Sequence, residues 1–104
     1  MVKIKVRKLN DSIKSIEIFG HAGFDQYGKD IVCAAISSIS IGLLNAIDIL
    51  TDETCEVEMT DNHIRIIVIK TDKIIQTVLS VGIIQLKTIE ESYPKNLKIE
   101  YTEV

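Results

Sequence analysis

The sequence predicts an α+β fold, a two-layer sandwich in which one largely antiparallel five-stranded sheet is covered by two helices. Five segments alternate apolar and polar residues, as strands with one buried face do. Two longer segments lie between them, giving the order strand, strand, helix, strand, strand, helix, strand. A chain of 104 residues suits one core, so residues 1–104 are expected to form a single domain.

The first two strands are expected to form a hairpin. Valine and isoleucine alternate with basic residues over positions 2–7, and a second alternating run covers positions 13–19. The Asn-Asp pair at positions 10–11 supplies turn chemistry between them. This hairpin delivers the chain to Gly20.

The first helix is expected over residues 33–50, with Asp30 as its N-cap. One apolar stripe has helical spacing and should face the core: Ile36, Ile39, Leu43, Ile47 and Leu50. A second apolar side carries Ile41, Leu44 and Ile49, where the surface helix of a monomer would be polar. We therefore expect a homodimer that covers this second side.

The second half repeats the pattern of hairpin and helix. Positions 55–59 and 64–68 alternate around a turn at Asp61-Asn62. A helix of about twenty residues, capped by Thr71 or Asp72, is expected to end at Tyr93 before Pro94, and a closing strand follows over positions 97–101.

Composition excludes several classes of protein. The net charge of -3 argues against direct binding of nucleic acid, which needs clustered cations. Two cysteines without a charged-then-apolar leader are typical of reduced thiols in a cytoplasmic protein. Polar residues interrupt the apolar runs before they reach the roughly 20 residues of a bilayer span, so no membrane helix is expected.

A cysteine and a histidine flank a glycine-punctuated loop. Cys33 lies at the start of the expected helix, where the macrodipole lowers a thiol pKa and favours the nucleophilic thiolate. His21, in the loop, can act as its base, since the loop leaves a strand and returns to the helix. The backbone N–H groups of Cys33 and Ala34 can form an oxyanion hole, and Ser37 is placed one turn further to line a cleft.

The sequence also allows purely structural roles for the cysteines and histidines. Cys33 can be a small buried residue and His21 a surface residue, and for Cys55 and His63 such roles are favoured. Asp30 can cap the helix, orient His21, or do both. Ser40, two turns beyond Cys33, is a further cleft candidate. A zinc site from the two cysteines and two histidines is disfavoured, because their spacing lacks the short paired intervals of zinc motifs.

The stretch Gly20-His21-Ala22-Gly23, followed by Gly28-Lys29-Asp30-Ile31-Val32-Cys33-Ala34-Ala35 and Ser37, resembles the signature of the ribosomal-processing cysteine proteases. The resemblance implies an endopeptidase that removes an N-terminal extension from a large-subunit ribosomal protein, the L-twenty-seven protein, during ribosome assembly. It also implies His21 and Cys33 as the catalytic pair, a homodimer and no cofactor or metal. Gly20, Gly23, Asp30, Ala34 and Ser37 would support the site or bind substrate.

A competing class is a non-catalytic dimeric module that binds a peptide or a ribosomal protein, with Cys33 merely packed. A thiol redox or metal protein is a weaker alternative, because there is no Cys-x-x-Cys pair. Selective alkylation of Cys33 over Cys55 at neutral pH would favour the enzyme. For the enzyme we further expect residues 22–29 to form a gate that closes over the bound peptide.

Overall fold

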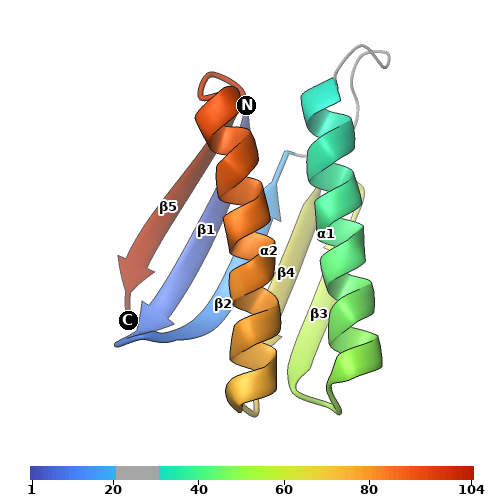
Figure 1. Ribbon diagram of the computed structural model, residues 1–104, viewed down its shortest axis with the longest axis vertical. Helices are drawn as coiled ribbons and strands as arrows, with labels where there is room; N and C mark the ends of the chain where they lie inside the picture. Colours follow the sequence, from blue (N-terminus) through green and yellow to red (C-terminus); the bar gives the residue numbers. More distant parts are fainter. Residues whose placement is uncertain (21–30) are drawn as a thin grey trace.

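A computed structural model describes residues 1–20 and 31–104. Five strands form one sheet, and two helices lie side by side over one of its faces (Figure 1). The elements, in chain order, are β1 (Val2–Leu9), β2 (Ser12–Phe19), α1 (Ile31–Leu50), β3 (Cys55–Thr60), β4 (His63–Val68), α2 (Lys73–Ser92) and β5 (Leu97–Glu103). This is the predicted α+β sandwich with the predicted order of elements.

The sheet has the strand order β3-β4-β2-β1-β5. Three neighbouring pairs are antiparallel, with Ile4 opposite Ile18 between β1 and β2, and Ile16 opposite Ile66 between β2 and β4. The fourth pair, β1 with β5, is parallel and sets Ile4 opposite Ile99. The sheet is therefore mixed, and the prediction of a largely antiparallel sheet is confirmed. The two edges are β3 and β5.

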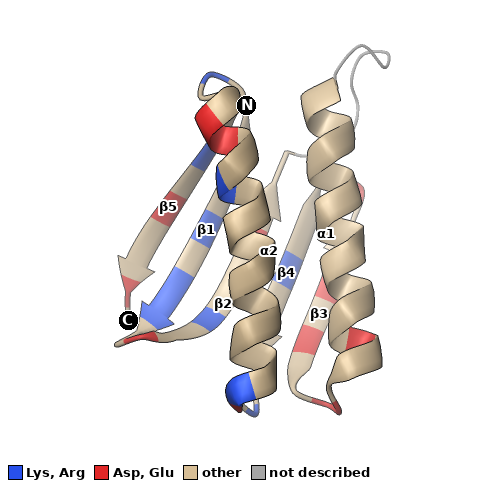
Figure 2. Cartoon of the chain, viewed as in Figure 1, with Lys and Arg blue, Asp and Glu red and all other residues tan. Residues whose placement is uncertain are grey.

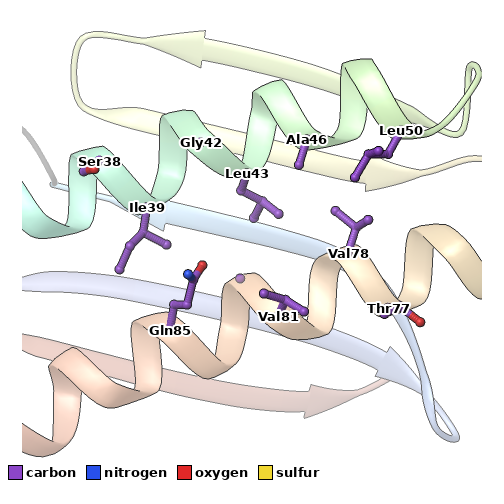
Figure 3. A pocket seen from close by; sticks show the side chains of 11 residues that line it. Ser38, Ile39, Gly42, Leu43, Ala46, Leu50, Thr77, Val78, Val81 and Gln85 are labelled. Carbon is purple, nitrogen blue, oxygen red and sulfur yellow. The ribbon is translucent and has the colours of Figure 1, made fainter.

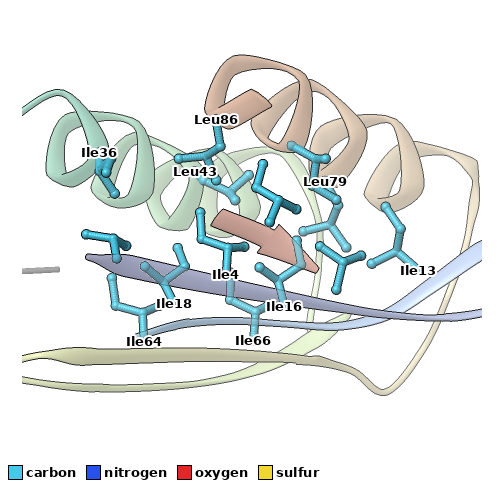
Figure 4. Close-up of a cluster of buried hydrophobic side chains, with 14 of the residues drawn as sticks. Ile4, Ile13, Ile16, Ile18, Ile36, Leu43, Ile64, Ile66, Leu79 and Leu86 are labelled. Atoms are coloured by element: carbon cyan, nitrogen blue, oxygen red, sulfur yellow. The ribbon is translucent and has the colours of Figure 1, made fainter. Parts of the chain in front are cut away.

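The core lies between the helices and the face of the sheet that they cover (Figure 4). Alternate residues of the strands point into it, because side chains on a strand alternate between its two faces. Ile4, Ile16 and Ile18 are fully buried there. The helices approach closely at Gly82, where an added Cβ would lie 2.8 Å from a Leu43 methyl group. The absence of a side chain at Gly82 thus leaves room for Leu43.

The second helix has the boundaries that the sequence predicts. Asp72 is its N-cap, and the side chain accepts a hydrogen bond of 2.8 Å from the backbone N–H of Ile75. At the other end the N–H of Tyr93 donates to the carbonyl of Ile89 at 2.8 Å. The cap satisfies a donor that the first turn of a helix otherwise leaves without an intrahelical partner.

Two apolar residues of α1 differ from the prediction. Leu50, expected in the buried stripe, is 58% exposed because it is the last residue of the helix and borders the groove between the helices. Leu44, expected on the outer side, is partly buried and packs against the core. Ile41 and Ile49 are exposed as predicted. The outer apolar side of α1 is therefore narrower than the sequence pattern indicates.

The apolar residues of β3 remain accessible. Val57 is 43% exposed and Met59 is 56% exposed, although both alternate as residues of a buried face do. The reason is that neither helix packs closely over this edge strand, whereas α2 packs over β5 at the other edge.

The first helix also meets the criteria for a membrane span by length and composition, with 20 residues and a mean hydropathy of 1.8. The expectation that no segment reaches this length was therefore wrong. Here Ile36, Leu43 and Ile47 of this helix lie in the core against the sheet. A helix that contributes one face to a core passes the same test of length and composition.

Candidate active site

The residues of the candidate site gather at one end of the sheet. There β2 ends at Phe19, the turn between β3 and β4 lies beside it, and α1 begins at Ile31 (Figure 1). Gly20 follows β2 with a φ of +75°, in the region that L side chains rarely adopt. Its N–H donates a hydrogen bond of 2.8 Å to the carbonyl oxygen of Asn62. The start of the glycine-punctuated stretch is therefore held against the β3–β4 turn.

Cys33 lies in the first turn of α1, as predicted, and its side chain is partly buried. The N–H groups of this turn point toward the helix N-terminus, where the positive end of the macrodipole favours an anion. Ala34 is the next residue and is exposed. The local field therefore suits both a thiolate at Cys33 and an oxyanion that forms beside it.

The two serines of α1 differ in position. Ser37 follows Cys33 by one helical turn and is partly buried, so it lies near the same edge of the helix. Ser40 is 1% exposed and lies within the core, and its Oγ has no hydrogen-bond partner among the described residues. An open cleft beside Cys33 can thus be lined by Ser37 and not by Ser40.

Cys55 has the surroundings of a structural thiol. Burial raises the pKa of this thiol, and a weak hydrogen bond of 3.7 Å from the Thr54 hydroxyl to Sγ acts in the opposite direction. A raised pKa keeps the group as the neutral thiol at neutral pH, and the neutral thiol is not a nucleophile. The two cysteines of the chain therefore differ in environment.

His63 also has structural partners. Its ring stacks on Phe19 with the centroids 4.6 Å apart, and its Nε2 lies 3.2 Å from a carboxylate oxygen of Glu17. Arg65 lies at 4.0 Å from the same carboxylate. These contacts place His63 in a cross-strand network on the face of the sheet opposite the helices, which agrees with the structural role favoured by the sequence.

Three of the predicted site residues, His21, Gly23 and Asp30, lie outside the described residues, and so does the predicted gate over 22–29. Among the described parts of the chain no group of three His, Cys, Asp or Glu side chains could hold a metal ion. The sequence did not predict the role of Asn62, whose carbonyl oxygen accepts the hydrogen bond from Gly20. Only its turn chemistry is visible in the sequence, because its role depends on pairing with a residue far along the chain.

Comparison with known proteins gives a consistent result. Residues 1–98 match the family model described as "Cysteine protease Prp". A Staphylococcus aureus protein named "Ribosomal processing cysteine protease Prp" is 37% identical over 99 residues, covering 89% of this chain and 92% of the relative. A Mycoplasma pneumoniae protein of the same name is 40% identical over 98 residues, with 89% and 92% covered.

Solved structures agree in fold along the whole chain. A crystal structure of the S. aureus protease Prp in complex with a substrate peptide has a TM-score of 0.87 and 32% identity, covering 98% of this chain and 100% of that one. The same protease with a covalently linked product peptide gives a TM-score of 0.88. A Streptococcus mutans protein gives 0.88 at 27% identity, covering 100% of this chain and 96% of that one.

Proposed function

Since the chain belongs to the Prp family of cysteine proteases, we propose that it is a ribosomal-processing endopeptidase with Cys33 as nucleophile and His21 as base. The observation that carries the assignment of the nucleophile is the place of Cys33 in the first turn of α1, inside the region that the family model matches. Cys55 starts an edge strand and has a raised pKa, which disfavours it as the nucleophile. His21 is assigned from the resemblance alone.

The chemistry follows from these roles. The Cys33 thiolate adds to the carbonyl carbon of the scissile bond, and the oxyanion that forms is stabilised by N–H groups at the start of α1. The protonated His21 gives its proton to the departing amine, so that the bond breaks and an acyl-thioester remains on Cys33. Water, deprotonated by His21, then hydrolyses the thioester and regenerates the thiolate. No cofactor takes part in these steps.

For the substrate we propose the N-terminal extension of a large-subunit ribosomal protein, the L-twenty-seven protein. Two observations support a ribosomal substrate: the relatives are named ribosomal processing proteases, and the S. aureus relative was crystallised with a substrate peptide. This function places the protein in the cytoplasm, where ribosomes assemble.

The test uses that ribosomal protein from the same organism as the chain. Incubation should produce one new N-terminus, which mass spectrometry identifies, and Cys33→Ser should abolish it. If the ribosomal protein binds without being cut, the chain is instead the non-catalytic binding module that the sequence leaves as the alternative.

We also propose that the protein is a homodimer that pairs through its helical layer. A groove of about 530 Å³ runs between α1 and α2 and is lined mainly by apolar side chains, with Leu43, Ala46 and Val81 among them (Figure 3). On the same helices Ile84, three residues after Val81, is 63% exposed, and Ile49 is 76% exposed. The small residues along this side of α1 allow another helix to approach closely. These apolar side chains need a cover, which a second copy can supply.

A further inference from the structure

We propose that the edge strand β3 is the docking strand for the substrate: an extended stretch of basic and apolar polypeptide pairs with β3 and lies in the groove between β3 and α1. This inference rests on the proposed function, because it concerns the surface that leads to Cys33. It commits to one occupant, the substrate chain beside the scissile bond. A second copy of this protein is the competing occupant.

The groove is formed by the C-terminal half of α1, the α1–β3 connection and the start of β3. It has a volume of about 320 Å³, and it is lined by Leu44 and Asp48 of α1 together with Cys55 and Val57 of β3. In a helix, residues at spacings of four, seven and eleven share a face. By that spacing Cys33 lies on the same side of α1 as Leu44. The side of α1 that faces β3 therefore carries the nucleophile at its N-terminal end.

The direction of β3 agrees with this geometry. β3 runs antiparallel to α1, from Cys55 beside the C-terminal half of the helix toward its N-terminus (Figure 1). Thr60 ends β3, and the turn that follows holds Gly20 through the Asn62 carbonyl. Met59, which is 56% exposed, thus lies toward the end of the molecule where Cys33 is found. A strand added to β3 would lead to the nucleophile.

The backbone of β3 is suited to accept such a strand. Hydrogen-bonded and non-hydrogen-bonded pairs alternate along an antiparallel ladder, and the pair that closes a two-residue turn is a hydrogen-bonded one. Thr60 and His63 form that closing pair. Val57 and Met59 therefore belong to non-hydrogen-bonded pairs. Their N–H and C=O groups point away from β4, toward the open edge of the sheet. Val57 lines the groove, and the side chain of Met59 lies on the same face of the sheet, so one partner strand can use both.

Charge indicates what kind of polypeptide fits. Between residues 30 and 64 the chain has no lysine or arginine, whereas residues 48–61 contain six acidic residues. Asp48 and Glu53 line the groove itself. Figure 2 shows the contrast, with acidic residues on β3 and basic residues on β1. An extended chain with apolar side chains at alternate positions and lysine or arginine near them complements this surface.

The experiment follows amide hydrogen exchange in the Cys33→Ser variant, which can bind substrate without cutting it. The probe is a synthetic peptide that spans the extension and cleavage junction of the organism's ribosomal protein. With the peptide bound, exchange at the Val57 and Met59 amides should slow by about tenfold or more. The Glu58 amide, which points to β4, is the internal control and should change little.

Each outcome decides between the hypotheses. Bound peptide without protection at Val57 and Met59 overturns the docking strand and leaves the protease intact. If exchange at these two amides slows without peptide as the protein concentration rises, a second copy of this protein pairs with β3. This result also overturns the docking strand. If the peptide neither binds to the variant nor is cut by the wild type, the proposed function fails and the docking strand falls with it.

A charge test gives an independent readout. Asp48→Asn and Glu53→Gln should each raise KM for the peptide by roughly three- to fivefold at low salt, with kcat unchanged and the effect fading as salt increases. Asp11→Asn, in the β1–β2 turn and two strands away from β3 in the sheet, is the matched control. Equal KM values for all three variants would contradict a basic peptide in this groove.

Discussion

The backbone N–H of Gly20 donates a 2.8 Å hydrogen bond to the carbonyl oxygen of Asn62. This contact ties the end of β2 to the β3–β4 turn, and the chain leaves that contact through a Gly20 φ of +75°. The stretch that carries His21 therefore starts from a fixed point. Disturbing Gly20 should affect both stability and catalysis.

For Gly20→Ala we expect a loss of about 1 kcal/mol in the free energy of unfolding, since a Cβ is unfavourable at positive φ. Cleavage should fall as well, because the start of the loop moves. Gly42→Ala is the matched control: its Cβ would meet nothing within 4 Å, and alanine in a helix should stabilise by roughly 0.5–1 kcal/mol. Urea unfolding of both variants checks this. A Gly20→Ala protein as stable as wild type would show that the backbone there relaxes freely.

Cys33→Ser should keep the fold and reduce kcat on the order of a thousandfold or more, because a hydroxyl is far less acidic than a thiol. Cys55→Ser should retain most of the activity and is the control. Cleavage of the ribosomal protein, together with circular dichroism of both variants, provides the measurement. Full activity in Cys33→Ser would exclude the proposed mechanism.

His21→Ala should abolish cleavage and move the pH profile of Cys33 alkylation upward. The reason is that an imidazolium beside a thiolate stabilises the charged form, and its removal makes the thiol harder to ionise. Alkylation with iodoacetamide across a pH series, read out by mass spectrometry, measures the shift. An unchanged profile would remove His21 from the pair.

Cys55 should react slowly with iodoacetamide in the folded protein at neutral pH. Burial raises the pKa of its thiol, so at any pH below that value the reactive thiolate is scarcer than in an unfolded chain. The rate should climb only as the pH rises above the ordinary range for cysteine, and unfolding in urea should increase the rate at neutral pH. Equal rates in the folded and the unfolded chain would contradict the effect of burial.

Ile84→Glu should convert the proposed dimer into a monomer, because a charge would then lie on the exposed apolar side of α2, one helical turn from Val81 of the groove. Ile69→Glu is the matched control, since Ile69 is 56% exposed and follows β4 rather than facing that groove. Sedimentation of both variants decides the matter. Leu44→Glu is less suitable, since Leu44 packs against the core and its loss would also unfold the protein. A dimeric Ile84→Glu protein would place the interface elsewhere.

The elements themselves were predictable from the sequence, because each depends on a local pattern. The alternation over positions 2–7 and 13–19 and the two-residue turn at Asp61-Asn62 lead to both hairpins. The length of α2 and the proline after Tyr93 led to its boundaries. The parallel pairing of β5 with β1 could not be predicted in this way, since no local signal states which strands become neighbours.

The orientation of individual side chains was less predictable. The alternation in β3 indicated a buried face, but burial depends on what lies next to the strand, and β3 is at the edge. Leu50 was expected in the core and is exposed, whereas Leu44 was expected on the outer side and packs against the core. Helical spacing shows which residues share a face, but it does not show which element each residue contacts. Cys33 was placed correctly at the start of its helix, since helix boundaries leave a local signal.

The pairing of β1 with β5 has a consequence for biosynthesis. β1 finds its parallel neighbour only when residues 97–103 have been synthesised, and that neighbour brings the buried Leu97 and Ile99 to the core. Until then β1 has an open edge, and contacts so distant in sequence form late in folding. The nascent chain therefore completes its sheet only once β5 has left the ribosome. Until that point the helices and the start of α1 rest on a sheet that lacks one edge strand.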